Sequence, residues 1–317
     1  MGRALEAGLF GPVAEDLDRF EALIRDSVAA DGPPLAGPMG DLFAAGGKRL
    51  RPALVLLAGR LGRLSDAHYH AAAAVELTHA ATLVHDDVID NSAIRRGQAT
   101  VAAALGDAPA IVVGDYYFAK AYQQAALTDD PAVVGAIAGA VMTICRGELA
   151  QNRARFHYRP SLTEYGARIE AKTAALLAAS AWVGGRLAGL EAAQQEALRL
   201  YGTELGLAFQ IADDVLDYTA GEAELGKPVG HDLLEGHATL PLLLADLPEP
   251  LPEGAPLLAA RVAEVVAAVR ASEGPERALA EARKHAESAR RHLAGLSEGP
   301  ARESLERLTG YVVERKL

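Results

Sequence analysis

The chain has 317 residues, of which 50% are hydrophobic and only 5% aromatic, and its formal net charge is −11. A chain of this length can close around one core, and a core built mainly from Ala, Leu and Val favours helices. The negative charge argues against nucleic acid or an anionic membrane surface as the main partner, because both require a basic surface.

Cysteine content and apolar runs indicate the expected compartment. Cys145 is the only cysteine, which excludes an internal disulfide framework and a thiolate metal site, and we interpret it as a small buried residue in a reducing cytoplasm. The N-terminus lacks the apolar stretch and cleavage site of a signal peptide. The apolar runs from Val133 and Ala174 are shorter than the roughly 18 to 20 residues that span a bilayer. We therefore expect buried helices, no membrane span and a cytoplasmic protein.

Apolar residues recur at helical spacing along the whole chain. The first predicted helix covers residues 13–29 and ends at the Gly/Pro-rich segment 31–38. Further helices are predicted over 39–45, after Pro52, and over 66–91, 107–127, 131–152, 161–188 and 191–217, with amphipathic helices from Leu242 onward. No strand pattern or internal repeat is apparent. The sequence thus predicts an all-α fold, with residues 1–317 forming a single helical domain.

Two acidic triplets of identical spacing end predicted helices. The first, within HAATLVHDDVIDNSAIRRGQ, and the second, within FQIADDVLD, contain Asp86, Asp87 and Asp90, and Asp213, Asp214 and Asp217. On an α-helix the first and last acids of each triplet share one face, where they would repel one another unless a cation such as Mg²⁺ neutralised them. A solvated helix end is the alternative for either triplet, but two copies are hard to assign to chance.

Cations near these acids are candidates for anion binding. Arg95 and Arg96 follow the first triplet, and guanidinium groups match phosphate oxygens bidentately. In GGKRLRP, residues 46–52, glycines can present backbone N–H groups to a phosphate together with the adjacent cations. A solvated basic turn is the alternative. Lys172 lies inside an otherwise apolar helix, so its side chain either extends to the surface or meets an anion.

Two other segments adjoin the triplets in the sequence, one before the first triplet and one after the second. The helix before the first triplet consists mostly of small residues, so a long apolar void could lie beside it, although tight packing on alanine is the alternative. The glycine-rich segment 218–241, with Lys227 and Asp232, is predicted to be a mobile loop over the acids.

In order and spacing these motifs resemble those of the trans-prenyltransferases, also called polyprenyl diphosphate synthases. The likeness is carried by GGKRLRP, HDDVIDxxxxRRG, KT in a mid-chain helix, FQxxDDxxD and GKPxxxDxxxGxxTLP, from about Gly46 to Pro241, and continues weakly to the C-terminal YVVERK. The resemblance implies an isoprenoid-synthase-type helical bundle around a central cavity, with the two aspartate motifs at its mouth, and a homodimer.

The resemblance also implies a role for each motif residue. Three Mg²⁺ ions gripping the allylic diphosphate would be held by Asp86, Asp87, Asp90, Asp213 and Asp217, with Asp214 behind them. The same diphosphate would be bound by Arg95, Lys172, Thr173, Gln210 and Lys227, and isopentenyl diphosphate by Lys48, Arg51, His79 and Arg96. The expected catalytic residues are Asp86, Asp87, Asp90, Lys172 and Asp213.

The implied reaction sets an expectation for product length. Diphosphate leaves the allylic carbon, Mg²⁺ and cations stabilise the departing charge, and the isopentenyl double bond attacks the allylic cation. In the family, bulky aromatics just before the first motif stop the growing chain, whereas Ala81 and Thr82 are small. We expect a long all-trans product, C30–C50 with C35–C40 favoured. Its floor could be an aromatic residue of the next helix: Tyr116, Tyr117, Phe118 or Tyr122.

Several other functions compete with this one. A C15–C20 synthase of the same family would share every motif. A terpene cyclase is disfavoured because its usual second motif is an Asn/Ser/Glu pattern, which FQIADDVLD is not. A non-catalytic subunit would not need both acidic motifs intact, and a lipid- or quinone-binding protein would leave the mapped acids and cations without a role.

Overall fold

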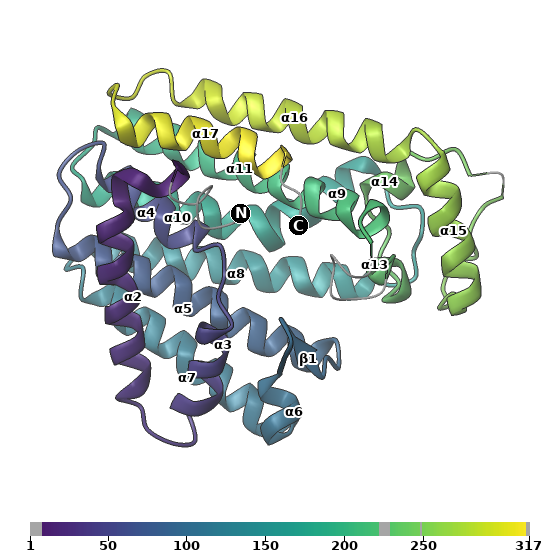
Figure 1. Ribbon diagram of the computed structural model, residues 1–317, viewed down its shortest axis with the longest axis horizontal. Helices are drawn as coiled ribbons and strands as arrows, with labels where there is room; N and C mark the ends of the chain where they lie inside the picture. The colour runs from purple at the N-terminus through teal and green to yellow at the C-terminus, as the bar shows by residue number, and fades with distance from the viewer. Residues whose placement is uncertain (1–7, 222–228, 248, 315–317) are drawn as a thin grey trace. The chain divides into compact units, whose positions relative to one another are not determined.

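The computed structural model describes residues 8–221, 229–247 and 249–314, and these form helices and one two-stranded hairpin (Figure 1). The predicted all-α fold class is confirmed. Contacts between Cα atoms divide the chain into two compact units. Unit 1 comprises Met1–Val141, Leu176–Arg199 and Gly295–Glu306, and unit 2 comprises Met142–Ala175, Leu200–Ala294 and Arg307–Leu317. The organisation as a single domain stays a prediction.

Unit 1 is built around α5 (Asp66–Ile89), which packs against α4 (Leu50–Gly59) and α7 (Asp107–Ala126). The unit also contains η1 (Gly11–Val13), α2 (Ala14–Ala29), α3 (Ala36–Ala44), α6 (Val101–Leu105), the first part of α8 (Pro131–Arg153) and most of α10 (Ala175–Leu187). The predicted helices 13–29, 66–91 and 107–127 were right to within two residues at each end. Helix α3 begins three residues before the predicted position because Pro38 is tolerated in a first helical turn, and α6 was not predicted.

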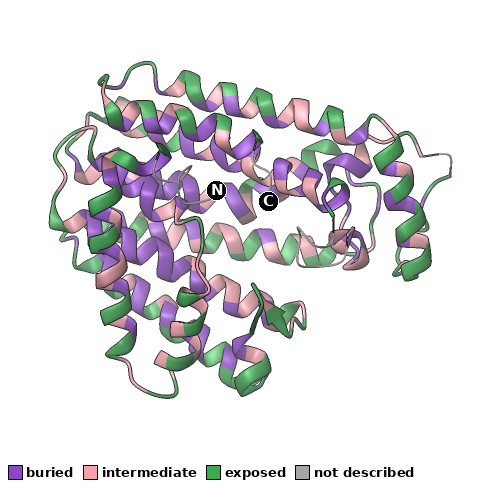
Figure 2. Ribbon diagram, viewed as in Figure 1, coloured by how far each residue is buried: buried purple, intermediate pink, exposed green. Residues whose placement is uncertain are grey.

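The alanine-rich half of α5 belongs to the packed core of unit 1. Ala71, Ala72, Ala73 and Ala74 have no exposed surface, and buried residues run along α4 and α5 in Figure 2. A Cβ added to Gly59 of α4 would lie 2.5 Å from the His68 ring of α5. Tight helix packing on alanine therefore describes this half of the helix.

A hairpin that was not predicted carries the two adjacent arginines. Strands β1 (Ile94–Arg95) and β2 (Gln98–Ala99) pair antiparallel, with Ile94 opposite Ala99. Both turn residues are left-handed, Arg96 with φ of 51° and Gly97 with φ of 77°, as in the two-residue turns that match strand twist. Strands of two residues have no detectable alternation, and Arg is not a usual first residue of such a turn, which explains why the sequence did not reveal the hairpin.

Unit 2 contains the second acidic triplet and a π-helical turn around Lys172. Its elements are α9 (Leu162–Ile169), the π-helical turn η2 (Glu170–Ala174), most of α11 (Ala192–Thr219), α13 (His231–Leu234), α14 (Leu240–Leu243), α15 (Ala259–Ala271), α16 (Gly274–His292) and part of α17 (Pro300–Glu314). The helix predicted over 161–188 is continuous over residues 162–187, but Glu170–Ala174 within it form a π-turn. Single π-turns are rare and are found frequently at functional sites.

Helix α8 differs most from expectation. It has 23 residues and, among the described residues, is the one helix long and apolar enough to cross a bilayer by length and composition alone. Only 22% of its most apolar window is buried, and Met142 and Leu149 are 55% and 62% exposed. The prediction of a buried helix was therefore wrong for α8, whereas a single helix that passes this test by length and composition is weak evidence for a membrane span. Cys145, expected to be buried, is exposed as well, because a helix that is apolar on several faces does not reveal which face is covered.

Candidate diphosphate and metal site

The basic turn of unit 1 is joined to the hairpin. Arg49 precedes α4 with φ of 46°, and Arg96 is the left-handed residue of the hairpin turn. Such conformations cost a non-glycine residue about 1–3 kcal/mol and persist where surrounding contacts hold them. The Arg96 guanidinium donates a hydrogen bond to the Gly46 carbonyl. Lys48 lies exposed in the same turn.

His79 of α5 lies among these cations. Burial lowers the pKa of its imidazole well below the usual range, and the positive charges of Arg51, Arg96, Arg95 and Arg49 lower it further. Burial also lowers the pKa of Arg51, whose Nε has no hydrogen-bond partner among the described residues. Neither Arg51 nor Arg96 forms an ion pair within the described part of the chain. The cluster is therefore a neutral imidazole surrounded by positive charge, an arrangement suited to an anion.

Arg49 is held by two carboxylates that sequence reasoning missed. Its Nη1 lies 2.8 Å from Glu76 Oε1, and its Nε donates to Glu21. Glu76 is only 6% exposed, and its charge favours the protonated forms of Arg51 and Arg96. These partners lie 27 and 28 residues from Arg49, so no local spacing indicated them. Arg49 therefore organises the cluster rather than adding a free cation to it.

The first acidic triplet lies at the C-terminal end of α5, with one acid committed to an arginine. Asp87 is 3% exposed, and its Oδ1 accepts a hydrogen bond from Arg95 Nε at 2.8 Å and forms an ion pair with Arg95 Nη2 at 2.8 Å. Asp86 and Asp90 are half-buried, and Asp90 caps the helix. Among the described residues no three acids, histidines or cysteines already lie together as a metal centre.

The residues expected to control chain length lie one turn earlier on α5. Ala81 has no exposed surface, whereas Thr82 is half-buried and its hydroxyl donates to the His79 carbonyl at 2.7 Å. Of the four candidate aromatics on α7, Phe118 packs against His85 of α5, with ring centroids 5.6 Å apart. Tyr116 and Tyr117 instead donate to Asp31, at 2.6 and 3.2 Å.

In unit 2 the second triplet belongs to a buried hydrogen-bond network. Asp214 accepts from the Tyr165 hydroxyl at 2.6 Å and from Gln210 Nε2 at 2.8 Å. Gln210 Oε1 accepts from Thr173 Oγ1 at 2.7 Å. Burial, followed by the negative charge of Asp232, raises the pKa of Asp214 to about 8. This chain of bonds fixes Gln210 and Thr173 and leaves Asp213 half-buried on α11.

Lys172 and Thr173 lie in the π-turn, which two glycines allow to pack closely. A Cβ on Gly206 of α11 would lie 2.5 Å from Ala174 Cα, and one on Gly147 of α8 would lie 2.8 Å from the Ala171 Cβ. Lys172 Nζ lies 2.8 Å from Glu148 Oε2. The sequence allowed the Lys172 side chain either to extend to the surface or to contact an anion, and the structure favours contact with an anionic group.

The segment after α11 packs back on the second triplet. Asp217 is 2% exposed, and its Oδ2 accepts from the Asp232 N–H at 3.2 Å. The Gly230 N–H donates to the Asp217 carbonyl at 2.9 Å. Lys227 lies outside the described residues, as do residues 222–228 of the segment 218–241 that was expected to be a mobile loop, whereas Asp232 lies in the described helix α13.

The predicted residues therefore form two groups. Unit 1 holds Lys48, Arg51, His79, Ala81, Thr82, Asp86, Asp87, Asp90, Arg95 and Arg96, and unit 2 holds Lys172, Thr173, Gln210, Asp213, Asp214 and Asp217. The residues missed from the sequence are Glu21, Glu76, Glu148 and Tyr165. Each group combines carboxylates with cations, the chemistry that metal-assisted handling of a diphosphate requires.

Comparisons with known proteins point to one family. Residues 33–250 match the family model described as polyprenyl synthetase. The chain is 36% identical to heptaprenyl diphosphate synthase component 2 of Geobacillus stearothermophilus over 97% of its length and 98% of the relative. It is 37% identical to octaprenyl diphosphate synthase of Escherichia coli, covering 95% and 96% of the two chains. The crystal structure of a polyprenyl synthase from Caulobacter crescentus, complexed with calcium and isoprenyl diphosphate, matches with a TM-score of 0.92 and 36% identity over 98% of each chain.

Proposed function

The chain belongs to the polyprenyl synthetase family, whose members are Mg²⁺-dependent prenyltransferases, and we propose that it condenses isopentenyl diphosphate with an allylic diphosphate into a long all-trans polyprenyl diphosphate. One observation supports this most strongly. Arg51 and Arg96 lie beside a neutral His79 without ion pairs of their own among the described residues. A strongly charged anion such as a diphosphate compensates that charge.

The cationic cluster of unit 1 is the proposed isopentenyl diphosphate site. Lys48, Arg51 and Arg96 supply charge, and His79 donates a hydrogen bond from a neutral ring. Because Glu21 and Glu76 hold Arg49, that side chain positions the turn instead of competing for the diphosphate.

The two triplets provide the proposed metal ligands. Asp86 and Asp90, and likewise Asp213 and Asp217, are oxygen donors one helical turn apart, which suits Mg²⁺. Asp87 is the fifth proposed ligand, and it also fixes Arg95. When bound, Mg²⁺ neutralises the charge that develops on the departing diphosphate. We infer three ions per site; the Caulobacter relative is complexed with calcium and isoprenyl diphosphate, which supports a divalent metal in this chain as well.

The remaining motif residues would orient the allylic diphosphate. Lys172 presents a cation from the π-turn, and Thr173 and Gln210 are fixed by the network that ends on Asp214. Arg95 and Lys227 complete the proposed set. With both diphosphates positioned, the allylic C–O bond breaks, the isopentenyl double bond attacks the cation, and a proton is lost.

Product length follows from the small residues before the first triplet. We propose C30–C50, with C35–C40 favoured, and the relatives named heptaprenyl and octaprenyl diphosphate synthase support that range. Mass spectrometry of the product made from farnesyl and isopentenyl diphosphates tests it. A product no longer than C20 would identify the shorter-chain alternative.

Oligomeric state and partner form a separate proposal. We infer a cytoplasmic protein that forms a homodimer. The apolar side chains of Ile111 and Val112 on α7 and of Leu127 at its end are 45%, 63% and 55% exposed, and a partner surface would cover them. The Geobacillus relative is named a component of its synthase, so a second, different subunit is the competing assembly. Light scattering together with activity of the chain alone separates the two.

The central experiment is Mg²⁺-dependent release of pyrophosphate by the purified chain. We expect release only when both diphosphates are present, and its loss in Asp86→Ala with an unchanged melting temperature. Asp18→Ala, an exposed acid on α2, is the matched control. Full activity of Asp86→Ala would contradict the proposed metal site, and binding of both substrates without turnover would indicate the lipid-binding alternative.

A further inference from the structure

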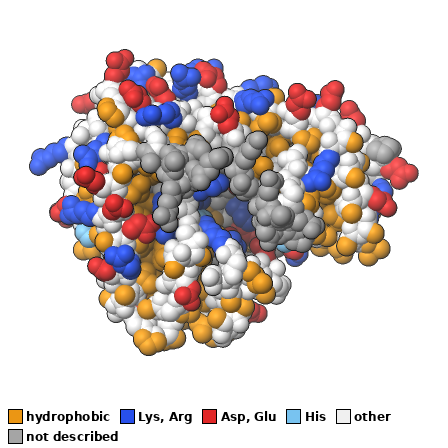
Figure 3. Space-filling view, in the orientation of Figure 1, with side chains coloured by type: hydrophobic (Ala, Val, Ile, Leu, Met, Phe, Trp, Pro, Cys, Tyr) orange, Lys and Arg blue, Asp and Glu red, His pale blue; other side chains and the backbone are white. Residues whose placement is uncertain are grey.

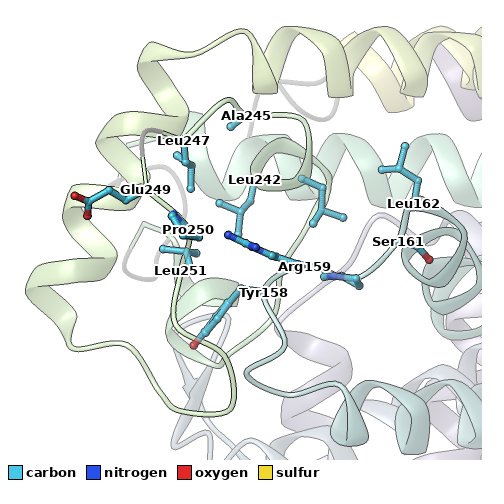
Figure 4. A pocket seen from close by; sticks show the side chains of 12 residues that line it. Tyr158, Arg159, Ser161, Leu162, Leu242, Ala245, Leu247, Glu249, Pro250 and Leu251 are labelled. Atoms are coloured by element: carbon cyan, nitrogen blue, oxygen red, sulfur yellow. The ribbon is translucent and has the colours of Figure 1, made fainter.

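A groove in unit 2 lies outside every motif assigned above. It is formed by residues 158–162, before and at the start of α9, and by residues 242–247 and 249–251, at and after α14 (Figure 4). Its volume is about 470 Å³, within the range of small-molecule sites. Leucines line it from both segments: Leu162, which is 56% exposed, and Leu242, Leu243, Leu247 and Leu251.

One arginine supplies the positive charge of this groove. Figure 4 shows the Arg159 side chain extended among Leu242, Pro250 and Leu251. Among the described residues Arg159 has neither a hydrogen bond nor an ion pair. Glu249, the one acid lining the groove, lies 3.7 Å from Arg261 instead. The groove therefore combines a guanidinium without a counter-charge and an apolar wall.

The apolar wall is held in place by the core of unit 2. Tyr158 donates from its N–H to Glu253 Oε2 and from its hydroxyl to the Ala255 carbonyl, both at 3.2 Å. Tyr158, Leu242 and Leu251 belong to the same buried cluster as Tyr218. A ligand would therefore meet a formed surface and would not have to order it.

We propose that this groove binds an anionic amphiphile, with a phosphate or diphosphate head on Arg159 and a hydrocarbon chain on the leucines. Guanidinium groups recognise phosphate bidentately, and burial of hydrocarbon on an apolar wall adds affinity with each methylene. The identification with a prenyl phosphate rests on the proposed function, since such molecules are its substrates and products. Phospholipid headgroups share this chemistry, but the net charge of −11 disfavours an anionic membrane, so we assign a dissolved amphiphile.

The test is calorimetric titration of the full chain with n-decyl phosphate, which has no allylic bond to break. We expect binding at least about tenfold weaker in Arg159→Gln, because a hydrogen bond to a charged group is lost. Leu247→Glu, which places a carboxylate opposite Arg159, should weaken binding similarly. Arg283→Gln removes an exposed arginine of α16 and is the matched control, expected to bind like the wild type.

Two further arms identify the source of the ligand and separate this proposal from the proposed function. Sedimentation with phosphatidylglycerol vesicles should give no Arg159-dependent binding, and vesicle binding without decyl phosphate binding would overturn the assignment. Equal affinity of wild type, Arg159→Gln and Leu247→Glu for decyl phosphate would overturn the groove itself. Initial rates of pyrophosphate release should be the same in Arg159→Gln and in the wild type, because the groove lies outside the proposed reaction site. A wild type that releases no pyrophosphate but binds decyl phosphate through Arg159 would refute the proposed function and leave the groove proposal standing.

Discussion

His79 offers the sharpest test of the proposed isopentenyl diphosphate site. Burial and four neighbouring arginines keep its pKa well below the ordinary value, so the ring should remain neutral across physiological pH. A neutral ring can donate one hydrogen bond to a diphosphate but adds no charge. Gln is also neutral and has an N–H donor, so His79→Gln should preserve the interaction, whereas His79→Ala should abolish it.

The magnitude follows from that single hydrogen bond. A hydrogen bond to a charged group contributes about 1.5–3 kcal/mol, and each 1.4 kcal/mol is a factor of ten. His79→Ala should therefore raise the KM for isopentenyl diphosphate about 10- to 150-fold, with kcat little changed because the contact exists before and during the reaction. His79→Gln should remain within a few fold of the wild type.

Steady-state kinetics at saturating allylic diphosphate between pH 5.5 and 8.5 measure both effects. Neither the wild type nor His79→Gln should show an inflection near the ordinary histidine pKa of about 6.5. The depressed pKa also means that the unfolded chain takes up a proton below that pH while the folded chain does not, so His79 lowers stability as pH falls. An inflection in the wild type that disappears in His79→Gln would refute a neutral His79.

Other predictions test buried groups and packing. Because the pKa of Asp214 in the folded chain is raised to about 8, its contribution to stability is greatest below the ordinary carboxylate pKa and is lost as pH rises toward 8. The melting temperature of Asp214→Asn should therefore increase relative to that of the wild type between pH 5 and 8. A constant difference in melting temperature over this range would argue against a protonated Asp214. Gly206→Ala should lower the free energy of unfolding by about 1–3 kcal/mol, because the added Cβ overpacks on the π-turn, and it should raise the KM for the allylic substrate. The control is Gly135→Ala on α8, which should leave stability unchanged or increase it, because a Cβ there has open space. Ala81→Phe should shorten the product in mass spectrometry, and an unchanged distribution would mean that the chain does not grow past this residue.

The distribution of surface charge agrees with the composition, which argued against nucleic acid or an anionic membrane as the main partner. Acidic and basic side chains are intermixed over the visible face in Figure 3, without the one-sign basic field that nucleic acid or an anionic membrane would require. The charges that matter for the proposed function are concentrated around His79 instead.

The sequence by itself determined the features that depend on near neighbours. Helix positions follow from apolar periodicity, and the two aspartate triplets, the basic turn and Lys-Thr are recognisable because each motif is contained in a few residues. The helix containing Lys172 was predicted, but its π-turn was not, since that turn depends on glycines at 147 and 206 that let other helices approach.

Only the tertiary structure decided which groups pair and which faces are covered. Arg49 belongs to Glu21 and Glu76, and Tyr165 to Asp214, across separations that no spacing rule connects. The exposure of Cys145 was likewise invisible, because several faces of α8 are apolar. Pairing and burial are set by contacts between distant segments, and these distinguish Arg49, a positioning residue, from Arg51, an arginine left for an anion.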